Sequence, residues 1–141
     1  MSNLDDLKLS NQLCFPLYVL SKEIINQYRP YLEELGITYP QYLVLMVLWE
    51  QDHLTVGQIG EKVYLDSGTL TPLLKRLEQK EIVTRNRCVN DERIVRISLT
   101  EEGIQMKGKA CLIPKAMLNQ LNIDEEELRV LKQIIKKLNQ K

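Results

Sequence analysis

Residues 66–80, DSGTLTPLLKRLEQK, constrain the fold more than any other stretch of the sequence. Leu70, Leu73, Leu74 and Leu77 follow the i, i+3, i+4, i+7 spacing of one buried helical face, and the side chains between them are polar and partly basic. Such a helix, placed after another short helix and before a basic hairpin, is typical of an element that lies in a DNA groove. An ordinary amphipathic helix has the same pattern, so the flanking segments decide between the two.

Two helix-start patterns come before this stretch. TYPQ at 38–41 and TVGQ at 55–58 both predict a capping box, and the first also has proline in the first turn. The residues YLVLMVLWEQ after the first box are apolar almost all round, which predicts a core helix. The second box opens a short helix to about residue 65. Asp66 or Ser67 then caps the next helix, so the unit is helix, tight turn, helix.

The pattern changes from helical to extended after residue 80. IVTRNRC and RIVRISL alternate Ile and Val with Arg and Thr, and Asn90 with Asp91 supplies a turn, so we predict a two-stranded hairpin. Its arginines lie on or beside the turn: Arg85, Arg87, Arg93 and Arg96. The two helices and the basic hairpin together make a winged helix-turn-helix.

Long apolar helices flank this unit. Residues 9–35 are apolar over more than one face and are expected to end at Gly36. Because a chain of 141 residues has only a modest core, we predict that this helix also packs against a partner subunit. Thr100 and Asp124 begin later helices, and Pro114 interrupts the chain between them. The last helix has one apolar stripe, which is expected to pack beside the first helix in the dimer.

The charge balance limits how the chain can bind nucleic acid. Nineteen basic and nineteen acidic residues give zero net charge, which excludes a tail-type binder that works by bulk attraction. Residues 1–65 carry four Lys and Arg against eight Asp and Glu, whereas residues 66–96 carry seven against five. The positive charge is therefore concentrated around the predicted helix and hairpin.

The N-terminal residues, the cysteines and the single histidine bear on the cellular compartment and on metal binding. The acidic N-terminus lacks an apolar signal core and no run of eighteen apolar residues exists, so we expect a cytoplasmic protein without a membrane segment. The cysteines, Cys14, Cys88 and Cys111, form neither an even disulfide framework nor a C-x-x-C pair, which favours a reduced compartment. His53 is the single histidine, and no metal-ligand spacing is present, so we expect no metal.

At these residues the sequence resembles the MarR family of transcriptional regulators. LDSGTLTPLLKRLEQKEIVTR, the wing NDERIVRISLTEEG with Asp91 and Arg93, and the flanking helices all look like that family, so the resemblance covers nearly the whole chain. It implies a mainly α fold with a small β-hairpin wing, which binds double-stranded DNA as a homodimer without cofactor or enzymatic activity. It also implies one domain over 1–141, with dimerisation helices at about 1–35 and 101–141 and a DNA-binding region at about 38–100.

A narrower resemblance concerns Cys14. The run Leu13-Cys14-Phe15, together with Tyr28 and Tyr39, resembles the OhrR/SarZ-like branch, which senses organic hydroperoxides and related oxidants through one cysteine. A peroxide sensor needs a thiolate, because the thiolate attacks the O–O bond to give a sulfenic acid. Cys14 has no basic neighbour in sequence. Its thiolate is stabilised either by the helix N-terminus, if Pro16 marks the first turn, or by tyrosine hydroxyls.

The spacing along the first helix separates the cysteine from the tyrosines. Fourteen helical residues between Cys14 and Tyr28 span roughly 21 Å, so the two cannot touch within one straight helix. The resemblance implies that Tyr28 and Tyr39 of one chain bond the cysteine of the other. Oxidation would then disturb the spacing of two recognition helices, which must match major grooves about 34 Å apart.

Each candidate residue also has a plain structural interpretation. Cys14 can be a small buried hydrophobe, Cys111 is a possible second thiol without a marker of that role, and Cys88 is best read as a strand residue. Tyr28 and Tyr39 can be packing residues. For the wing we predict that Arg93 enters the minor groove with Asp91 orienting it, the alternative being a surface ion pair. The remaining DNA candidates lie off the leucine face or on the hairpin: Ser67, Thr69, Thr71 and Arg76, placed in the first two helical turns, with Lys75, Arg85 and Arg87.

The function expected from these residues is regulation of transcription. We predict a homodimeric repressor that binds a pseudo-palindromic operator and responds to oxidation of Cys14 by organic hydroperoxides. The alternative is a MarR-type regulator that responds to a small aromatic ligand, with Cys14 incidental. A third class, a thiol peroxidase, lacks support because the sequence contains no resolving-cysteine motif or further catalytic set.

Overall fold

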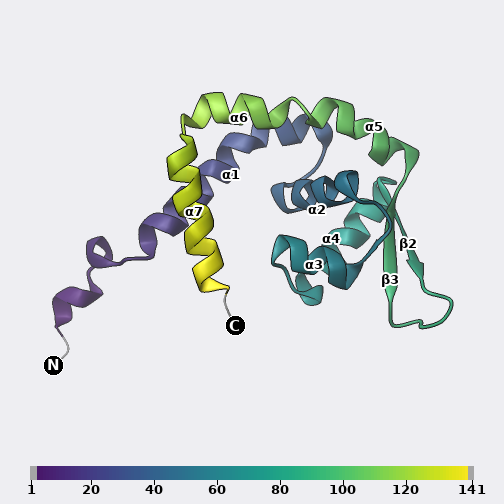
Figure 1. Cartoon of the computed structure of the whole chain (residues 1–141), viewed down its shortest axis with the longest axis horizontal. Coiled ribbons are helices and arrows are strands. Elements are labelled where there is room, and N and C mark those ends of the chain that lie inside the picture. Colours follow the sequence, from purple (N-terminus) through teal and green to yellow (C-terminus); the bar gives the residue numbers. More distant parts are fainter. Residues whose placement is uncertain (1–2, 140–141) are drawn as a thin grey trace. The chain divides into compact units, whose positions relative to one another are not determined.

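The computed structural model describes residues 3–139, so residues 1–2 and 140–141 of the predicted 1–141 domain lie outside the described part. The chain shown in Figure 1 divides into two compact units, Met1–Cys111 and Leu112–Lys141. The first unit contains α1 (Phe15–Leu35), α2 (Tyr39–Glu50), β1 (Leu54–Thr55), α3 (Val56–Val63), α4 (Ser67–Gln79), β2 (Val83–Arg87), β3 (Val95–Leu99) and α5 (Glu101–Ala110). The second unit contains α6 (Ile113–Leu121) and α7 (Glu125–Leu138).

Helix α1 begins later than its apolar pattern predicts. The chain before it forms two short 3-10 turns, Leu4–Leu7 and Leu9–Asn11, and Cys14 is the N-cap residue of α1. Pro16 lies in the first turn, where its fixed φ suits a helix start and its missing N–H is not needed, so the predicted start near residue 9 is wrong. Gly36 ends the helix as predicted, with a φ of 70° that glycine adopts without a Cβ clash.

The helix-turn-helix unit starts where the sequence predicts. Both capping boxes are confirmed, at Thr38 before α2 and at Thr55 before α3. Helix α3 ends at Val63, two residues earlier than expected, because Tyr64 adopts a left-handed conformation with a φ of 58°. Asp66, rather than Ser67, is the N-cap residue of α4, and its side chain accepts a hydrogen bond from the backbone N–H of Thr69.

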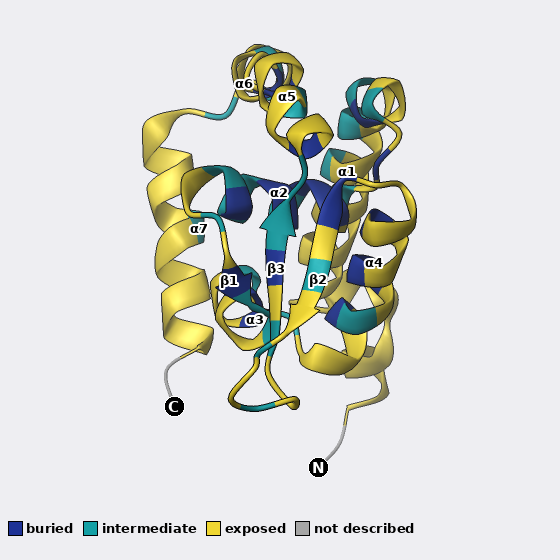
Figure 2. Cartoon of the chain, turned by 90° about the vertical axis from the view of Figure 1, so that its right-hand side faces the viewer, coloured by how far each residue is buried: buried dark blue, intermediate teal, exposed yellow. Residues whose placement is uncertain are grey.

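The core of the first unit lies where α2 and α4 meet. These helices contact each other, and Figure 2 shows buried positions on α2, α4 and β3. The predicted leucine face of α4 is confirmed, because all four of its leucines are buried: Leu70, Leu73, Leu74 and Leu77. Val44, Leu45 and Leu48 of α2 are also buried, as expected for the most apolar helix of the chain. Burial of the leucine face fixes which side of α4 remains exposed.

The wing is part of a three-stranded antiparallel sheet with strand order β1-β3-β2. The predicted hairpin is confirmed as β2 and β3, but the prediction of two strands missed β1. That strand has two residues, Leu54 and Thr55, which pair with Ile97 and Arg96, and two residues are too short to show an alternating pattern. Figure 2 shows β3 between its two neighbours, with the connecting loop at residues 88–94 extending beyond the sheet.

The second unit is helical. Pro114 lies in the first turn of α6, so the predicted interruption near this residue is confirmed. Asp124 is the N-cap residue of α7, as predicted, and the structure adds that it forms a capping box with Glu127. Acidic residues in the first turn of α7 and Lys136 and Lys137 in its last turn both match the helix dipole.

Three chain-wide features bear on the site. No helix within residues 3–139 has the length and the apolar character needed to cross a membrane. The same described residues contain no group of three or more His, Cys, Asp or Glu side chains arranged to hold a metal ion. The three cysteines are free thiols; Cys14 and Cys111 are exposed and Cys88 is half-buried.

Candidate functional site

The first half of α4 presents the short polar side chains predicted to face DNA. Ser67 and Thr69 are exposed in the first turn, and Thr71 is half-buried one turn further on. Hydrogen bonds from Thr69 hold the pKa of Asp66 below its ordinary value, so this N-cap carboxylate stays charged at neutral pH. The cap fixes the direction in which the first turn of α4 leaves the preceding loop.

The basic residues of α4 lie further along the helix. Lys75 and Arg76 are both exposed. Arg76 lies in the last turn, not in the first two turns where the sequence analysis placed it, because α4 runs only from Ser67 to Gln79. The N-terminal part of a recognition helix contacts base edges, so a residue in the last turn is better suited to a phosphate contact.

The loop of the wing holds an arginine in a fixed geometry. The Asp91 carboxylate accepts hydrogen bonds from the Arg93 backbone N–H at 3.0 Å, from Nε at 3.1 Å and from Nη2 at 3.2 Å. These bonds lower the pKa of Asp91, and the Arg93 side chain remains 90% exposed. Arg87 braces the same loop, because its Nη1 donates to the Glu92 carbonyl at 2.8 Å. An arginine that is oriented but exposed at a loop tip is suited to insertion into a groove.

Other arginines of the hairpin hold the protein together. The Arg85 side chain is only 19% exposed and lies 3.7 Å from the Glu78 carboxylate of α4, so the structure makes it a brace between α4 and β2. Arg96 Nη1 donates to the His53 carbonyl at 2.6 Å. Asp52 accepts from the Leu99 backbone N–H at 2.9 Å. Sequence reasoning missed these anchors of β3, because they depend on strand β1.

The predicted tyrosines lie together where α1 meets α2. The rings of Tyr28 and Tyr39 have centroids 4.8 Å apart, and Tyr42 joins them at 5.9 and 6.2 Å. Burial raises the pKa of Tyr28 and of Tyr39, and the neighbouring Tyr28 raises the pKa of Tyr39 further. Burial, and then the neighbouring Tyr28 and Tyr39, raise the pKa of Tyr42 to about 12. The cluster therefore stays protonated and offers O–H donors rather than phenolate.

A cleft of about 300 Å³ lies beside this tyrosine cluster. Its walls include Tyr39 and the apolar side chains of Ile25, Leu32 and Ile37, and Arg29 contributes the positive charge. Tyr42, Arg29 and this cleft were all absent from the sequence prediction. Ile25, Arg29 and Leu32 are spaced so that they lie on adjacent turns of one face of α1. This spacing is the sequence signal that could have predicted the wall of the cleft.

Cys14 lies at the N-terminus of α1, fourteen residues before Tyr28. It is exposed at the N-cap position, with φ −91° and ψ −15°, and its side chain makes no capping hydrogen bond. One continuous helix of fourteen residues keeps the two side chains roughly 21 Å apart, so a single chain does not bring them together. Cys111 follows α5, and its Sγ lies 3.1 Å from the Gly108 carbonyl, to which the thiol donates. Cys88 directly follows β2 at the start of the wing loop, so the prediction that it is a strand residue is wrong.

Comparison with known families defines the class of protein. A family model described as transcriptional regulator SarA/Rot matches residues 26–110, which is more than half of the chain. The chain belongs to the SarA/Rot family of winged-helix transcriptional regulators, and the MarR-like fold predicted from the sequence is confirmed.

Two individual relatives show which regulators of this class the chain is similar to. The chain is 55% identical over 128 residues to the organic hydroperoxide resistance transcriptional regulator of Bacillus subtilis, covering 91% of this chain and 87% of that protein. It is 50% identical over 123 residues to the transcriptional regulator SarZ of Staphylococcus epidermidis, covering 87% and 83%. These relatives are regulators rather than enzymes, in agreement with the sequence prediction.

Solved structures of AbfR from Staphylococcus epidermidis show the same fold in several redox forms. Reduced AbfR bound to DNA matches with a TM-score of 0.82 and 38% identity, over 96% of this chain and 95% of that one. Overoxidized AbfR bound to DNA gives 0.78 and 39%, over 95% of both chains. Disulfide-formed AbfR gives 0.62 and 39%, over 95% and 89%.

Proposed function

We propose that this protein is a homodimeric repressor whose affinity for operator DNA is switched by oxidation of Cys14 by organic hydroperoxides. The observation that carries the proposal is the arrangement of α1, which exposes Cys14 at its N-terminus and, about fourteen residues further on, carries Tyr28 against Tyr39 of α2, both protonated. The identity to the hydroperoxide resistance regulator of Bacillus subtilis supports the class of oxidant. The DNA-bound forms of AbfR support the class of partner.

In this proposal α4 enters the major groove of double-stranded DNA. Ser67, Thr69 and Thr71 are the candidates for base and phosphate contacts, and Lys75 and Arg76 neutralise phosphates. The exposed Arg93, oriented by Asp91, enters the adjacent minor groove. Two such units bind a pseudo-palindromic operator only when the dimer holds them about 34 Å apart.

The exposed apolar residues support a dimer. Most of the N-terminal half of α1 is apolar and exposed, and Leu32 is the one residue of α1 that the single chain buries. Helix α7 likewise exposes apolar side chains along one face: Leu128, Val130, Ile134, Ile135 and Leu138. Large apolar surfaces of this kind mark protein interfaces. We propose that these faces meet in the homodimer, and that the tyrosines of one protomer thereby reach Cys14 of its partner.

The proposed chemistry is attack of a thiolate on a peroxide. The Cys14 sulfur forms a bond to the terminal peroxide oxygen, the O–O bond breaks, and the alkoxide leaves and takes up a proton to become an alcohol. The sulfur is oxidised to a sulfenic acid and the peroxide is reduced. A second thiol can then displace water to form a disulfide. The disulfide form of AbfR supports testing Cys111 in that role, with a small cellular thiol as the competing partner.

The proposal also assigns a compartment. The relatives in Bacillus subtilis and Staphylococcus epidermidis are bacterial regulators, and a bacterial regulator that binds chromosomal DNA acts in the cytoplasm. Cellular reductants there keep cysteines reduced, so Cys14 begins as a thiol and its oxidation carries information.

A DNA gel-shift titration with and without cumene hydroperoxide tests the proposal. Wild type is expected to lose affinity on oxidation, Cys14→Ser to bind DNA and ignore the oxidant, and Cys88→Ser to behave as wild type. Equal responses of wild type and Cys14→Ser would contradict the role of Cys14. Mass spectrometry after limited oxidation then identifies the product, and Cys111→Ser shows whether a disulfide needs the second thiol.

A further inference from the structure

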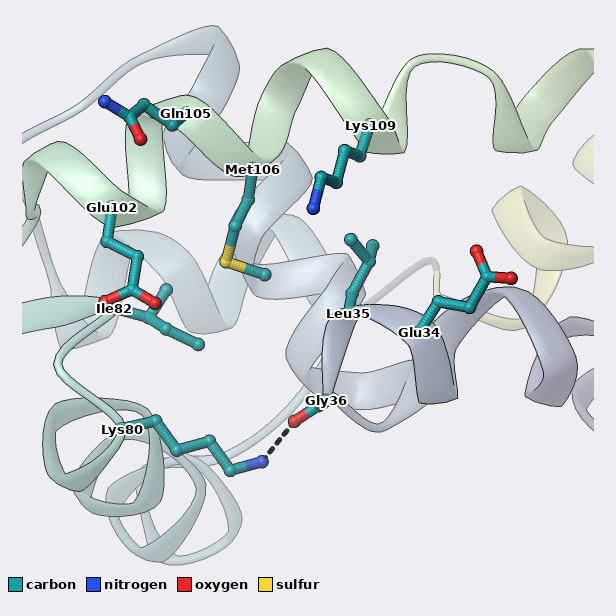
Figure 3. A pocket seen from close by; sticks show the side chains of 9 residues that line it. All are labelled: Glu34, Leu35, Gly36, Lys80, Ile82, Glu102, Gln105, Met106 and Lys109. Atoms are coloured by element: carbon teal, nitrogen blue, oxygen red, sulfur yellow. Dashed lines mark hydrogen bonds between the residues drawn. The ribbon is translucent and has the colours of Figure 1, made fainter.

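The C-terminal ends of α1 and α4 meet at a cleft of about 440 Å³ in the first unit. Figure 3 shows Lys80 extending from the end of α4 toward the Gly36 carbonyl at the end of α1, with Met106 and Lys109 of α5 on the other side. This is a place where the helix carrying Cys14 and the helix proposed to read DNA are joined by one side chain.

The contact from Lys80 is short and charge-assisted. Its Nζ donates to the Gly36 carbonyl at 2.5 Å. Gly36 closes α1, and its own N–H bonds to the carbonyls of Leu32 and Glu33. Carbonyls at a helix C-terminus carry partial negative charge, so an ammonium group there is stabilising. The bond therefore attaches α4 to the one end of α1 that is anchored by the buried residues Leu32 and Ile37.

The segment after Lys80 is attached to α5 by different contacts. The Ile82 carbonyl accepts from the backbone N–H and the Oγ1 of Thr100, both at 3.0 Å. A Cβ on Gly103 would lie 2.4 Å from that same carbonyl, so α5 packs directly against the backbone there. These contacts connect β2 to α5 through close backbone packing, whereas Lys80 connects α4 to α1 through a single long side chain. The link to α1 is accordingly the one that a small shift can break.

We propose that Lys80 is a positioning residue which couples α1 to α4, so that the Lys80–Gly36 bond is made in the reduced, DNA-binding form and broken in the oxidised form. The inference rests on the proposed function, because it requires that oxidation at Cys14 moves α1. A ligand or modification changes an equilibrium only by interacting differently with the two states. A bond present in one state and absent in the other supplies such a difference.

The test compares DNA affinities of reduced and oxidised protein for wild type, Lys80→Met, Lys80→Arg and Lys109→Met. Lys80→Met is expected to weaken the DNA affinity of the reduced form about fivefold, which is near the lower end of typical allosteric couplings. The DNA affinity of the oxidised form is expected to stay unchanged. The ratio of oxidised to reduced Kd then falls by the same factor. Lys80→Arg keeps a donor and is expected to restore most of the ratio.

Lys109→Met is the matched control. Lys109 lines the same cleft, and its side chain has no hydrogen bond or ion pair with the residues that the structure describes, so its replacement is expected to keep the wild-type ratio. A role of Lys80 in stability alone, or in a phosphate contact, would weaken both forms equally and leave the ratio unchanged. Circular dichroism confirms that each variant folds, and the rate of Cys14 oxidation is expected to be the same in all four proteins.

The outcomes separate the two proposals. A wild type that responds to oxidant together with a Lys80→Met variant of unchanged ratio overturns the coupling and leaves the proposed function intact. A wild type whose Kd does not change on oxidation overturns the proposed function and the coupling with it.

Discussion

At the residue scale, the tyrosine pair is the sharpest feature of the proposed redox site. Tyr28→Phe or Tyr39→Phe keeps the ring packing but removes one of the hydroxyl groups that we propose donate to the partner's thiolate. A hydrogen bond to a charged acceptor contributes about 1.5–3 kcal/mol, so the rate of Cys14 oxidation at neutral pH is expected to fall about tenfold or more. Stopped-flow measurement with cumene hydroperoxide checks this. Tyr64→Phe, an exposed tyrosine at the end of α3, is the control and should react at the wild-type rate.

The raised pKa of Tyr42 predicts how the stability of the fold changes at alkaline pH. Its pKa is raised to about 12, first by burial and then by the neighbouring Tyr28 and Tyr39, so below about pH 10 both the folded and the unfolded chain keep this proton. Between about pH 10 and 12 the unfolded chain releases a proton that the folded chain keeps, so stability falls by up to about 1.4 kcal/mol per pH unit. Urea unfolding near pH 9 and near pH 11 should show a smaller loss for Tyr42→Phe than for wild type. The same loss in both proteins would refute this assignment.

Two substitutions in the wing separate the effect of the Arg93 charge on DNA binding from the effect of its orientation by Asp91. Arg93→Ala should weaken DNA binding and reduce the salt dependence of the affinity by about one phosphate contact. Asp91→Ala keeps the arginine but removes its three hydrogen bonds. It should weaken binding while the salt dependence stays the same. Titrations at several salt concentrations distinguish the two, and an Asp91→Ala variant of wild-type affinity would show that orientation of Arg93 is unimportant.

At the element scale, two glycines of α5 give opposite predictions. A Cβ on Gly103 would lie 2.4 Å from the Ile82 carbonyl, whereas one on Gly108 meets no atom within 4 Å. Gly103→Ala should destabilise the fold by about 1–3 kcal/mol through overpacking. Gly108→Ala should stabilise it by about 0.5–1 kcal/mol, because alanine is the better helix former. Denaturant unfolding of both variants measures this, and a loss of stability in Gly108→Ala would contradict the packing.

Local chemistry explains which elements could be predicted from the sequence. The capping boxes at Thr38 and Thr55 and the cap residue Asp124 are patterns of a few neighbouring residues, so the starts of these helices were predicted correctly. The leucine spacing of α4 likewise predicted its buried face. Strand β1 could not be found, because two residues have no period and it exists only by pairing with β3. The start of α1 was misplaced because an apolar pattern extends across Pro16 while the helix does not.

The candidate site was predictable only in part, for a similar reason. Resemblance identified Cys14, Tyr28 and Tyr39, and their roles in this chain stay predictions. Other features of the site arise from contacts between residues that are not neighbours in sequence. They are the burial of Arg85 against Glu78, the packing of the Tyr42 ring against Tyr28, and the Lys80–Gly36 bond. Residue type suggested that Arg85 contacts DNA, but packing against Glu78 determines how much of its side chain DNA can reach.

At the scale of the whole molecule, the exposed apolar faces predict that assembly and DNA binding are linked. Ile134→Glu places a charge on the apolar face of α7 and should shift the protein toward monomers. DNA affinity should fall with it, because one unit alone loses the second half-site. Sedimentation at several protein concentrations measures the assembly. Lys132→Glu on the same helix is the control for charge, and its monomer–dimer equilibrium should stay near that of wild type.

The length of α1 also has a genetic consequence. Because one helix separates Cys14 from Tyr28, each proposed sensor takes its cysteine from one polypeptide and its tyrosines from the other. A Cys14→Ser chain and a Tyr28→Phe/Tyr39→Phe chain should each fail to respond when expressed alone. In a cell that expresses both chains, each mixed dimer has one intact sensor, made of Cys14 from the Tyr28→Phe/Tyr39→Phe chain and the tyrosines from the Cys14→Ser chain. Its other sensor lacks both the cysteine and the tyrosine hydroxyls. Two defective alleles should therefore complement each other and restore part of the peroxide response.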